Sequence, residues 1–271
     1  MIADWDDAYN NGGHIARAET YPPRWAAAAA AFRDEMTKAG RAELDIAYGE
    51  GERERFDLYR PDGPSKGLIV FVHGGYWMKF GRDSFSHLAR GGVEAGWTAA
   101  LPSYDLAPAI HISGITRQIG GAIEAAAERV AGPIHIAGHS AGGHLVSRMA
   151  CIDTPLTPAA RDRLQRIVSI SGLHDLRPLM KTAMNDTLHL DADEARAESA
   201  ALNEPLPGKR IVCWVGSLER PEFVRQNDLL ANVWTGLGAE ISARHDEGRH
   251  HFDVIEGLER ADSALMAALA G

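Results

Sequence analysis

The sequence predicts an α/β protein built on a mostly parallel, doubly wound sheet. Short apolar runs recur along the chain, and helical stretches separate most of them. The first run, LIVFV after Gly67, is continuous rather than alternating, as expected for a strand with helices on both faces. The later runs are Trp97–Leu101, Pro133–Ala137, Ile167–Ser171 and Ile211–Val215. In such a sheet, functional loops follow the carboxyl ends of the strands.

The elements before the first run predict one helix and an antiparallel edge. Pro22 and its neighbour introduce an alanine-rich stretch, Arg24–Lys38, which is typical of a helix, and Gly40 ends it. Two strand-like pieces follow at Ala42–Tyr48 and Arg53–Tyr59. The second alternates polar and apolar residues, as a half-buried strand does.

The segment Arg177–Pro207 interrupts the regular alternation of strands and helices. It is polar, rich in Asp and Ala, and lies between two of the predicted buried strands. We interpret it as a cap or lid insertion over the sheet edge. A chain of 271 residues can bury one large core, so residues 1–271 are predicted to form one domain with this insertion.

Composition excludes several classes of protein. With 45% hydrophobic and 24% charged residues, the chain is typical of globular proteins. Asp and Glu number 37 against 28 Lys and Arg, and the net charge of -9 disfavours nucleic acid and anionic membranes as partners. No apolar run reaches about 18 residues, so no membrane-spanning helix is expected.

The two cysteines, Cys151 and Cys213, match no CxxC or metal-ligand spacing. They are interpreted as buried thiols in a reducing compartment. The start of the chain lacks the basic flank and apolar core of a signal peptide. Together these features predict a cytoplasmic protein.

The strongest chemical motif is Gly138-His139-Ser140-Ala141-Gly142. It follows a predicted strand and precedes a helix expected over Gly143–Cys151. This is the G-x-S-x-G nucleophile elbow in its required strand–turn–helix context. Glycine is needed on either side because the turn is so tight that side chains there would collide. The motif predicts Ser140 as a nucleophile.

A second motif, His73-Gly74-Gly75-Tyr76-Trp77, ends the LIVFV strand. An HGG stretch at this place in the chain can supply backbone N–H groups to an oxyanion hole, together with the residue after the nucleophile. The expected donors are the N–H groups of Gly75 and Ala141, with Tyr76 or Gly74 as a third. His73 is interpreted as structural, because it precedes the nucleophile in a fold whose chain order is serine, acid, histidine. His139, next to the serine, is expected to point away from it and to be structural too.

The acid partner is expected after the strand Ile211–Val215. Glu219 lies there, just before a helix that Pro221 would begin, where a carboxylate can reach an imidazole. Asp175, after the preceding strand, is the rival candidate. Asp228 would lie well inside the helix and is interpreted as a solvated carboxylate.

The base is expected after the last strand, around Ile241–Arg244. The following tract contains His245, His250 and His251. His251 is preferred because the next residue, Phe252, can anchor its loop while a helix begins at Asp253. A metal site is not expected, since adjacent histidines seldom face one ion and no HExxH spacing is present.

With these residues assembled, the chain resembles the α/β-hydrolase superfamily and, within it, the kynurenine formamidase (arylformamidase) group of serine hydrolases. The resemblance covers nearly the whole chain and is carried by Tyr9-Asn10-Asn11, the His73–Trp77 and Gly138–Gly142 motifs, Ser171–Leu176, Pro221–Gln226 and His251–Glu256. It implies an α/β-hydrolase fold, with Glu219 as the acid and His251 as the base. Animal members have aspartate where this chain has Glu219, and glutamate is a longer but workable orienting group.

The resulting hypothesis is a cofactor-independent serine hydrolase. Ser140, His251 and Glu219 would cleave a small acyl amide or ester, most simply an aryl formamide such as N-formylkynurenine. Tyr76, Trp77 and residues of 177–207 are expected to line the substrate pocket, unless the two aromatic rings only pack beneath the cap. The expected partner is this small substrate.

Three alternatives stay open from the sequence. The enzyme can be a general short-chain carboxylesterase or an amidohydrolase for another small amide. It can also be a non-catalytic member of the superfamily used as a binding module, against which the intact Ser140, Glu219 and His251 set argues. The oligomeric state is open too, with a homodimer as one alternative.

Overall fold

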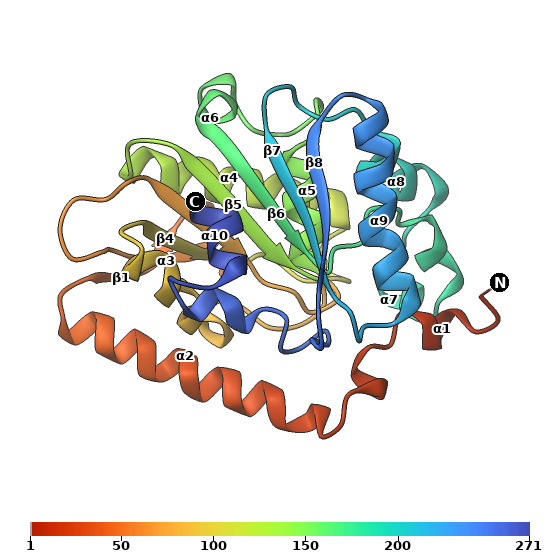
Figure 1. The fold of residues 1–271 in the computed structure, drawn as a ribbon, viewed down its shortest axis with the longest axis horizontal. Helices are drawn as coiled ribbons and strands as arrows, with labels where there is room; N and C mark the ends of the chain where they lie inside the picture. The colour runs from red at the N-terminus through yellow and green to blue at the C-terminus, as the bar shows by residue number, and fades with distance from the viewer. Residues whose placement is uncertain (1) are drawn as a thin grey trace.

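The protein, described here by a computed structural model over residues 2–271, is built on one eight-stranded sheet. The strand order is β1-β2-β4-β3-β5-β6-β7-β8 (Figure 1). β1 and β2 run antiparallel to their neighbours, and every pair from β4 to β8 is parallel. The predicted parallel sheet with an antiparallel edge is confirmed, and it is the sheet of the α/β-hydrolase fold.

The strands are β1 (Ala42–Ala47), β2 (Arg55–Tyr59), β3 (Leu68–Val72), β4 (Thr98–Pro102), β5 (Ile134–His139), β6 (Leu164–Ile170), β7 (Arg210–Gly216) and β8 (Glu240–Asp246). The α-helices are α1 (Trp5–Ala8), α2 (Tyr21–Lys38), α3 (Arg90–Glu94), α4 (Ile112–Arg129), α5 (Ala141–Met149), α6 (Pro158–Arg163), α7 (Asn185–Leu188), α8 (Ala192–Ala197), α9 (Pro221–Gly236) and α10 (Ala264–Ala270). Short 3₁₀ turns connect several of them: η1 (Gly12–His14), η2 (Ala18–Thr20), η3 (Arg82–Ser84), η4 (Ser86–Ala89), η5 (Arg177–Lys181), η6 (Ala200–Leu202) and η7 (Glu256–Glu259).

Alternate residues of the buried strands supply two separate hydrophobic cores. In β3, Leu68, Val70 and Val72 pack into the core shared with α4, α5 and α9. Ile69 and Phe71 point to the opposite face, toward the core shared with α2, α3 and α10. Side chains alternate across a strand, so a strand covered on both faces must be apolar at every position, which explains the LIVFV run. In Figure 1, α2 runs along the outside of the second core.

The predicted boundaries differ from the structure by a few residues. α2 begins at Tyr21, with Pro22 and Pro23 inside its first turn, where a missing N–H costs nothing. β6 begins at Leu164, directly after α6. α5 begins at Ala141, so Ser140 itself is the residue that precedes the helix.

The helix predicted from Asp253 is wrong. Residues 251–255 form turns, η7 covers Glu256–Glu259, and the last helix begins only at Ala264. The hydroxyl of Ser263 accepts from the N–H of Met266, at 2.9 Å, and caps the first turn of this helix. His251 therefore lies in a loop.

The segment Arg177–Pro207 forms the short helices α7 and α8 with flanking 3₁₀ turns η5 and η6. It packs beside α9 and α5: the indole N–H of Trp234 in α9 donates to the Asn203 carbonyl, at 2.9 Å, and Nε2 of His144 in α5 donates to the Glu198 carbonyl, at 2.8 Å. Among residues 2–271, no helix has the length and apolar character needed to cross a membrane. Cys151 and Cys213 are free thiols and are buried, as predicted.

The contact between α5 and β3 leaves no space for a side chain at Gly142. A Cβ added there would lie 2.0 Å from the carbonyl oxygen of Val72. We expect Gly142→Ala to lower the free energy of unfolding by at least about 3 kcal/mol, because backbone must move to relieve the clash. Urea denaturation followed by circular dichroism measures the change.

Gly236→Ala is the matched control, because Gly236 ends α9 and has open space around its Cα. It should leave stability unchanged or raise it slightly. Equal stability of the two variants would contradict the close contact between α5 and β3.

Candidate active site

Ser140 lies at the sharp turn between β5 and α5. Its backbone has φ 55° and ψ -116°, a strained conformation for a residue with a side chain. The N–H of Ser140 donates to the Ile170 carbonyl at 2.8 Å, which ties the turn to β6. A Cβ at Gly138 would lie 2.1 Å from the Gly142 carbonyl, so glycine is required there by the close turn. The expected elbow geometry is present.

The loop after β3 lies beside the serine. A Cβ on Gly74 would lie 3.0 Å from the Cβ of Ser140, so only glycine allows this approach. Gly75 has φ +118°, and Tyr76 and Trp77 also have positive φ values. Among the hydrogen bonds of residues 2–271, none is donated by the N–H groups of Gly75, Tyr76 or Ala141. Within the described residues, these N–H groups therefore have no protein acceptor.

Glu219 and His251 form a buried hydrogen-bonded pair. The distance between Glu219 Oε2 and His251 Nδ1 is 2.6 Å, and the side chains are 0% and 4% exposed. The other carboxylate oxygen accepts from the hydroxyl of Ser171, at 2.5 Å, and from the N–H of Gly216, at 2.9 Å. A buried carboxyl group held by several hydrogen bonds fixes the orientation of its imidazole partner.

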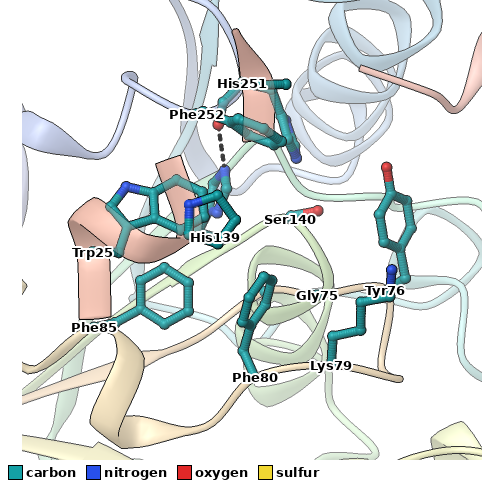
Figure 2. Close-up of a pocket in the computed structure, with 13 residues that line it drawn as sticks. Trp25, Gly75, Tyr76, Lys79, Phe80, Phe85, His139, Ser140, His251 and Phe252 are labelled. Carbon is teal, nitrogen blue, oxygen red and sulfur yellow. Dashed lines mark hydrogen bonds between the residues drawn. The ribbon is translucent and has the colours of Figure 1, made fainter. Parts of the chain in front are cut away.

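The imidazole of His251 is held in place by packing on both sides. The ring of Phe223 meets it edge-on at 4.8 Å between centroids, and the ring of His139 lies 4.6 Å away. Nε2 of His139 donates to the backbone carbonyl of His251 at 2.9 Å. Figure 2 shows the His251 ring directed toward Ser140 from above the pocket. The two side chains form no direct hydrogen bond among the described residues, and such contacts often close only with substrate bound.

His139 and His73 both make buried contacts of the kind expected for structural histidines. Burial lowers the pKa of His139 well below its ordinary value, so the ring is neutral and can bond the His251 carbonyl. His73 stacks on the ring of Tyr104, at 4.3 Å and 8° between planes, and burial lowers its pKa to about 4. Neither imidazole contacts the Glu219 carboxylate.

The rival carboxylates and histidines are engaged elsewhere. Asp175 forms a bidentate ion pair with Arg177, with its shorter distance at 2.8 Å. Asp228 pairs with His245 at 2.7 Å on the exposed side of α9 and β8. His250 bonds the hydroxyl of Tyr21 at 3.1 Å and receives backbone N–H groups from its own loop.

A cavity of about 230 Å³ lies above Ser140 and His251. Its walls are mainly aromatic and come from residues far apart in the sequence (Figure 2). The lining residues are Ala18, Pro22, Trp25, Gly74, Gly75, Tyr76, Lys79, Phe80, Phe85, His139, Ser140, His251 and Phe252. None of these described residues is acidic, and Lys79 is the single lysine or arginine among them.

Two expectations about the pocket are wrong. Trp77 does not line the cavity: its side chain is fully buried and meets the ring of His144 edge-on, at 5.3 Å, because the loop turns it into the core. No residue of 177–207 lines it either, because that segment packs beside α9. The first turns of α2 and the residues before it form the wall instead. Tyr76 does line the cavity.

Two residues near the carboxylate were not found from the sequence. Nδ2 of Asn11 donates to Glu219 Oε2 at 3.3 Å, and Ser171 donates to the other oxygen. Asn11 belongs to a motif that carried the resemblance, but no spacing rule links it to Glu219. Ser171 directly follows β6, and β6 pairs with β7, so the adjacency of these two strands is the signal that points to Ser171.

The described residues contain no group of three or more His, Cys, Asp or Glu side chains that could hold a metal ion.

Comparison with known proteins defines the class. The sequence profile of the alpha/beta hydrolase family matches residues 69–267. The chain belongs to this family, and the protein is a hydrolase.

Individual proteins within and beyond this family are also similar to the chain. The chain is 26% identical to the kynurenine formamidase of Danio rerio over 79% of its length and 76% of that protein. It is 27% identical to the kynurenine formamidase of Salmo salar, covering 83% and 80%. The crystal structure of a candidate thioesterase from Silicibacter sp. TM1040 is 47% identical, with a TM-score of 0.92 and 98% of each chain covered. An esterase from Pyrobaculum calidifontis, 19% identical with a TM-score of 0.69 over 93% and 94%, shares the fold.

The neutral state of His139 predicts a pH dependence of stability. In the unfolded chain this imidazole gains a proton as the pH falls through about 6.5, whereas the folded state excludes it. Stability is therefore lost as the pH falls below that value. We expect His139→Gln, which keeps a donor for the His251 carbonyl, to reduce the slope of unfolding free energy between pH 6 and 5 by about 1 kcal/mol per pH unit.

Urea titrations at several pH values measure this slope. His189→Asn is the control, because His189 is exposed and its left-handed backbone suits asparagine. An unchanged slope in His139→Gln would mean that His139 is protonated in the folded protein.

Proposed function

We propose that the protein is a serine hydrolase in which Ser140 is the nucleophile, His251 the general base and Glu219 the orienting acid. The observation that carries the proposal is the buried hydrogen bond of 2.6 Å between Glu219 and His251, at the same cavity as the strained Ser140. A carboxylate on Nδ1 leaves Nε2 of the imidazole as the acceptor for the serine proton.

The proposed reaction has two steps. Nε2 of His251 takes the proton of Ser140 as Oγ attacks the carbonyl carbon, and the tetrahedral oxyanion forms. The imidazolium then gives its proton to the departing amine or alcohol, and an acyl-enzyme remains. Water, activated by the same imidazole, releases the acid. The acyl group ends as formate when the substrate is a formamide.

The oxyanion is expected to bind to the N–H groups of Gly75 and Ala141, with Tyr76 or Gly74 as a third donor. Among the described residues, the N–H groups of Gly75, Tyr76 and Ala141 donate no hydrogen bond, and Gly74 lies close to Ser140. Ala141 is also the first residue of α5, where the helix dipole favours an anion. Loss of one such donor in related chemistry costs about 3 to 4 kcal/mol of transition-state stabilisation.

An aryl formamide such as N-formylkynurenine is the proposed substrate. The aromatic wall of Trp25, Phe80 and Phe85 suits an aryl group, and the ammonium of Lys79 suits a carboxylate on the same molecule. The kynurenine formamidase relatives support this substrate. The activity needs no cofactor in this proposal.

A short-chain carboxylic ester or thioester is the second candidate substrate. The observation that favours it is the apolar lining of the cavity, together with the 47% identity to the candidate thioesterase. An apolar pocket beside an oxyanion hole accepts an alcohol or thiol leaving group as readily as an aryl amine.

The proposal is tested by comparing turnover of N-formylkynurenine with that of short nitrophenyl esters and acyl thioesters. Ser140→Ala is the control, and its kcat should fall on the order of a thousandfold or more. Mass spectrometry after reaction with a fluorophosphonate probe should place the label on Ser140. A protein that neither turns over these substrates nor takes the label would be a binding module.

The two carboxylate candidates give a comparative prediction. Glu219→Gln should lower kcat on the order of a hundredfold to ten-thousandfold, because the amide can no longer stabilise the imidazolium. Asp175→Asn should cost much less, because Asp175 pairs with Arg177 rather than with His251. Steady-state kinetics of both variants on one ester measures the two losses in kcat. A larger loss in Asp175→Asn than in Glu219→Gln would identify Asp175 as the acid.

The size of the cavity predicts the acyl preference. Gly75, Tyr76 and Phe80 line the cavity together with Ser140, and its volume of about 230 Å³ has to hold both the acyl group and the leaving group. We expect kcat/KM to fall steeply from formyl and acetyl to longer acyl groups, measured on a series of nitrophenyl esters. A preference for long chains would contradict the formamidase proposal while leaving the serine mechanism intact.

A further inference from the structure

The N-terminal arm, residues 2–20, reaches the centre of the candidate active site. It docks on the turn between β7 and α9 that carries Glu219. The hydroxyl of Tyr9 donates to Glu222 Oε1 at 2.7 Å, and the guanidinium of Arg220 bonds the carboxylate of Asp7. Asp7 and Tyr9 both precede Asn11 in the chain, so the arm is fixed to the turn and to the start of α9 just before Asn11.

Asn11 is 2% exposed, and its side-chain amide accepts one hydrogen bond and donates another. Its Oδ1 accepts from the backbone N–H of Arg220 at 2.8 Å. An amide that accepts with its oxygen from this N–H must present its NH₂ group to Glu219 Oε2, 3.3 Å away. The orientation of the amide is therefore set by the backbone of the same turn.

The donor of Asn11 and the Nδ1–H of His251 share one carboxylate oxygen. Glu219 Oε2 accepts from both, while Oε1 accepts from Ser171 and Gly216. Each additional donor withdraws negative charge from the carboxylate and limits its rotation. Asn11 thus acts on the imidazole through Glu219 and does not touch the cavity.

We propose that Asn11 is a positioning residue that fixes the Glu219 carboxylate and sets how strongly it holds the protonated His251. This inference rests on the proposed Ser140–His251–Glu219 mechanism. Without the Asn11 donor, more negative charge remains on Oε2, so the imidazolium is held more strongly and the base is neutral only at higher pH.

The test uses the full chain with p-nitrophenyl acetate over pH 5 to 9. Asn11→Leu is close in size and excludes water from the donor position. We expect kcat to fall about five- to tenfold and KM to stay within twofold. The acidic limb of the kcat/KM profile should move up by about half a pH unit. Asn11→Ala is the second variant if the leucine variant does not fold.

Tyr9→Phe is the matched control, because it removes a buried hydrogen bond of the same arm without touching Glu219. It should leave the pH profile unchanged. A pH profile of wild-type shape in the Asn11 variants, or an equal shift in Tyr9→Phe, would overturn the inference and leave Asn11 as a structural contact.

Failure of the underlying mechanism gives a different result. Ser140→Ala, assayed in parallel, would then keep its activity, and the inference would fall together with the triad. Loss of activity in Ser140→Ala with no shift in the Asn11 variants refutes the role of Asn11 alone. An NMR proton resonance of His251 Nδ1–H that moves downfield in Asn11→Leu, but not in Tyr9→Phe, would support it directly.

Discussion

The buried carboxylate of Glu219 is the interaction on which the arrangement of the site depends. A carboxyl group with a side-chain exposure of 0% needs hydrogen-bond donors in place of the lost water, and four provide them, from Asn11, Ser171, Gly216 and His251. These donors come from the N-terminal arm, the end of β6, the end of β7 and the loop after β8. The side chain of Glu219 therefore holds these four segments in place relative to one another.

Close packing of the backbone also determines the geometry around Ser140. Gly138, Gly142 and Gly74 allow the elbow, β3 and the loop after it to approach to distances that a Cβ would prevent. The strained backbone of Ser140 is maintained by this close packing and by its bond to Ile170. Rigid surroundings hold the free N–H groups beside the serine, as electrostatic stabilisation of an oxyanion requires.

The N-terminal part of the chain forms one wall of the cavity. Ala18, Pro22 and Trp25 form one wall, opposite the loop that carries Tyr76 and Lys79. The residues that bond the turn carrying Glu219 and the residues that line the cavity thus belong to one continuous stretch of the N-terminal chain. A change in the docking of this stretch would alter both the pocket and the carboxylate, which couples substrate binding to the geometry of the proposed triad.

The sequence by itself determined the parallel sheet, its antiparallel edge and the strand–turn–helix around Ser140, because periodicity, glycine sterics and strand burial are local properties. Chain order also placed Glu219 and His251 in the loops where the structure brings them together. Only the tertiary structure decided that Trp77 is turned into the core, that 177–207 lies away from the cavity, and that Asn11 meets Glu219. These depend on side-chain direction and on contacts between segments some 200 residues apart, which no local pattern encodes.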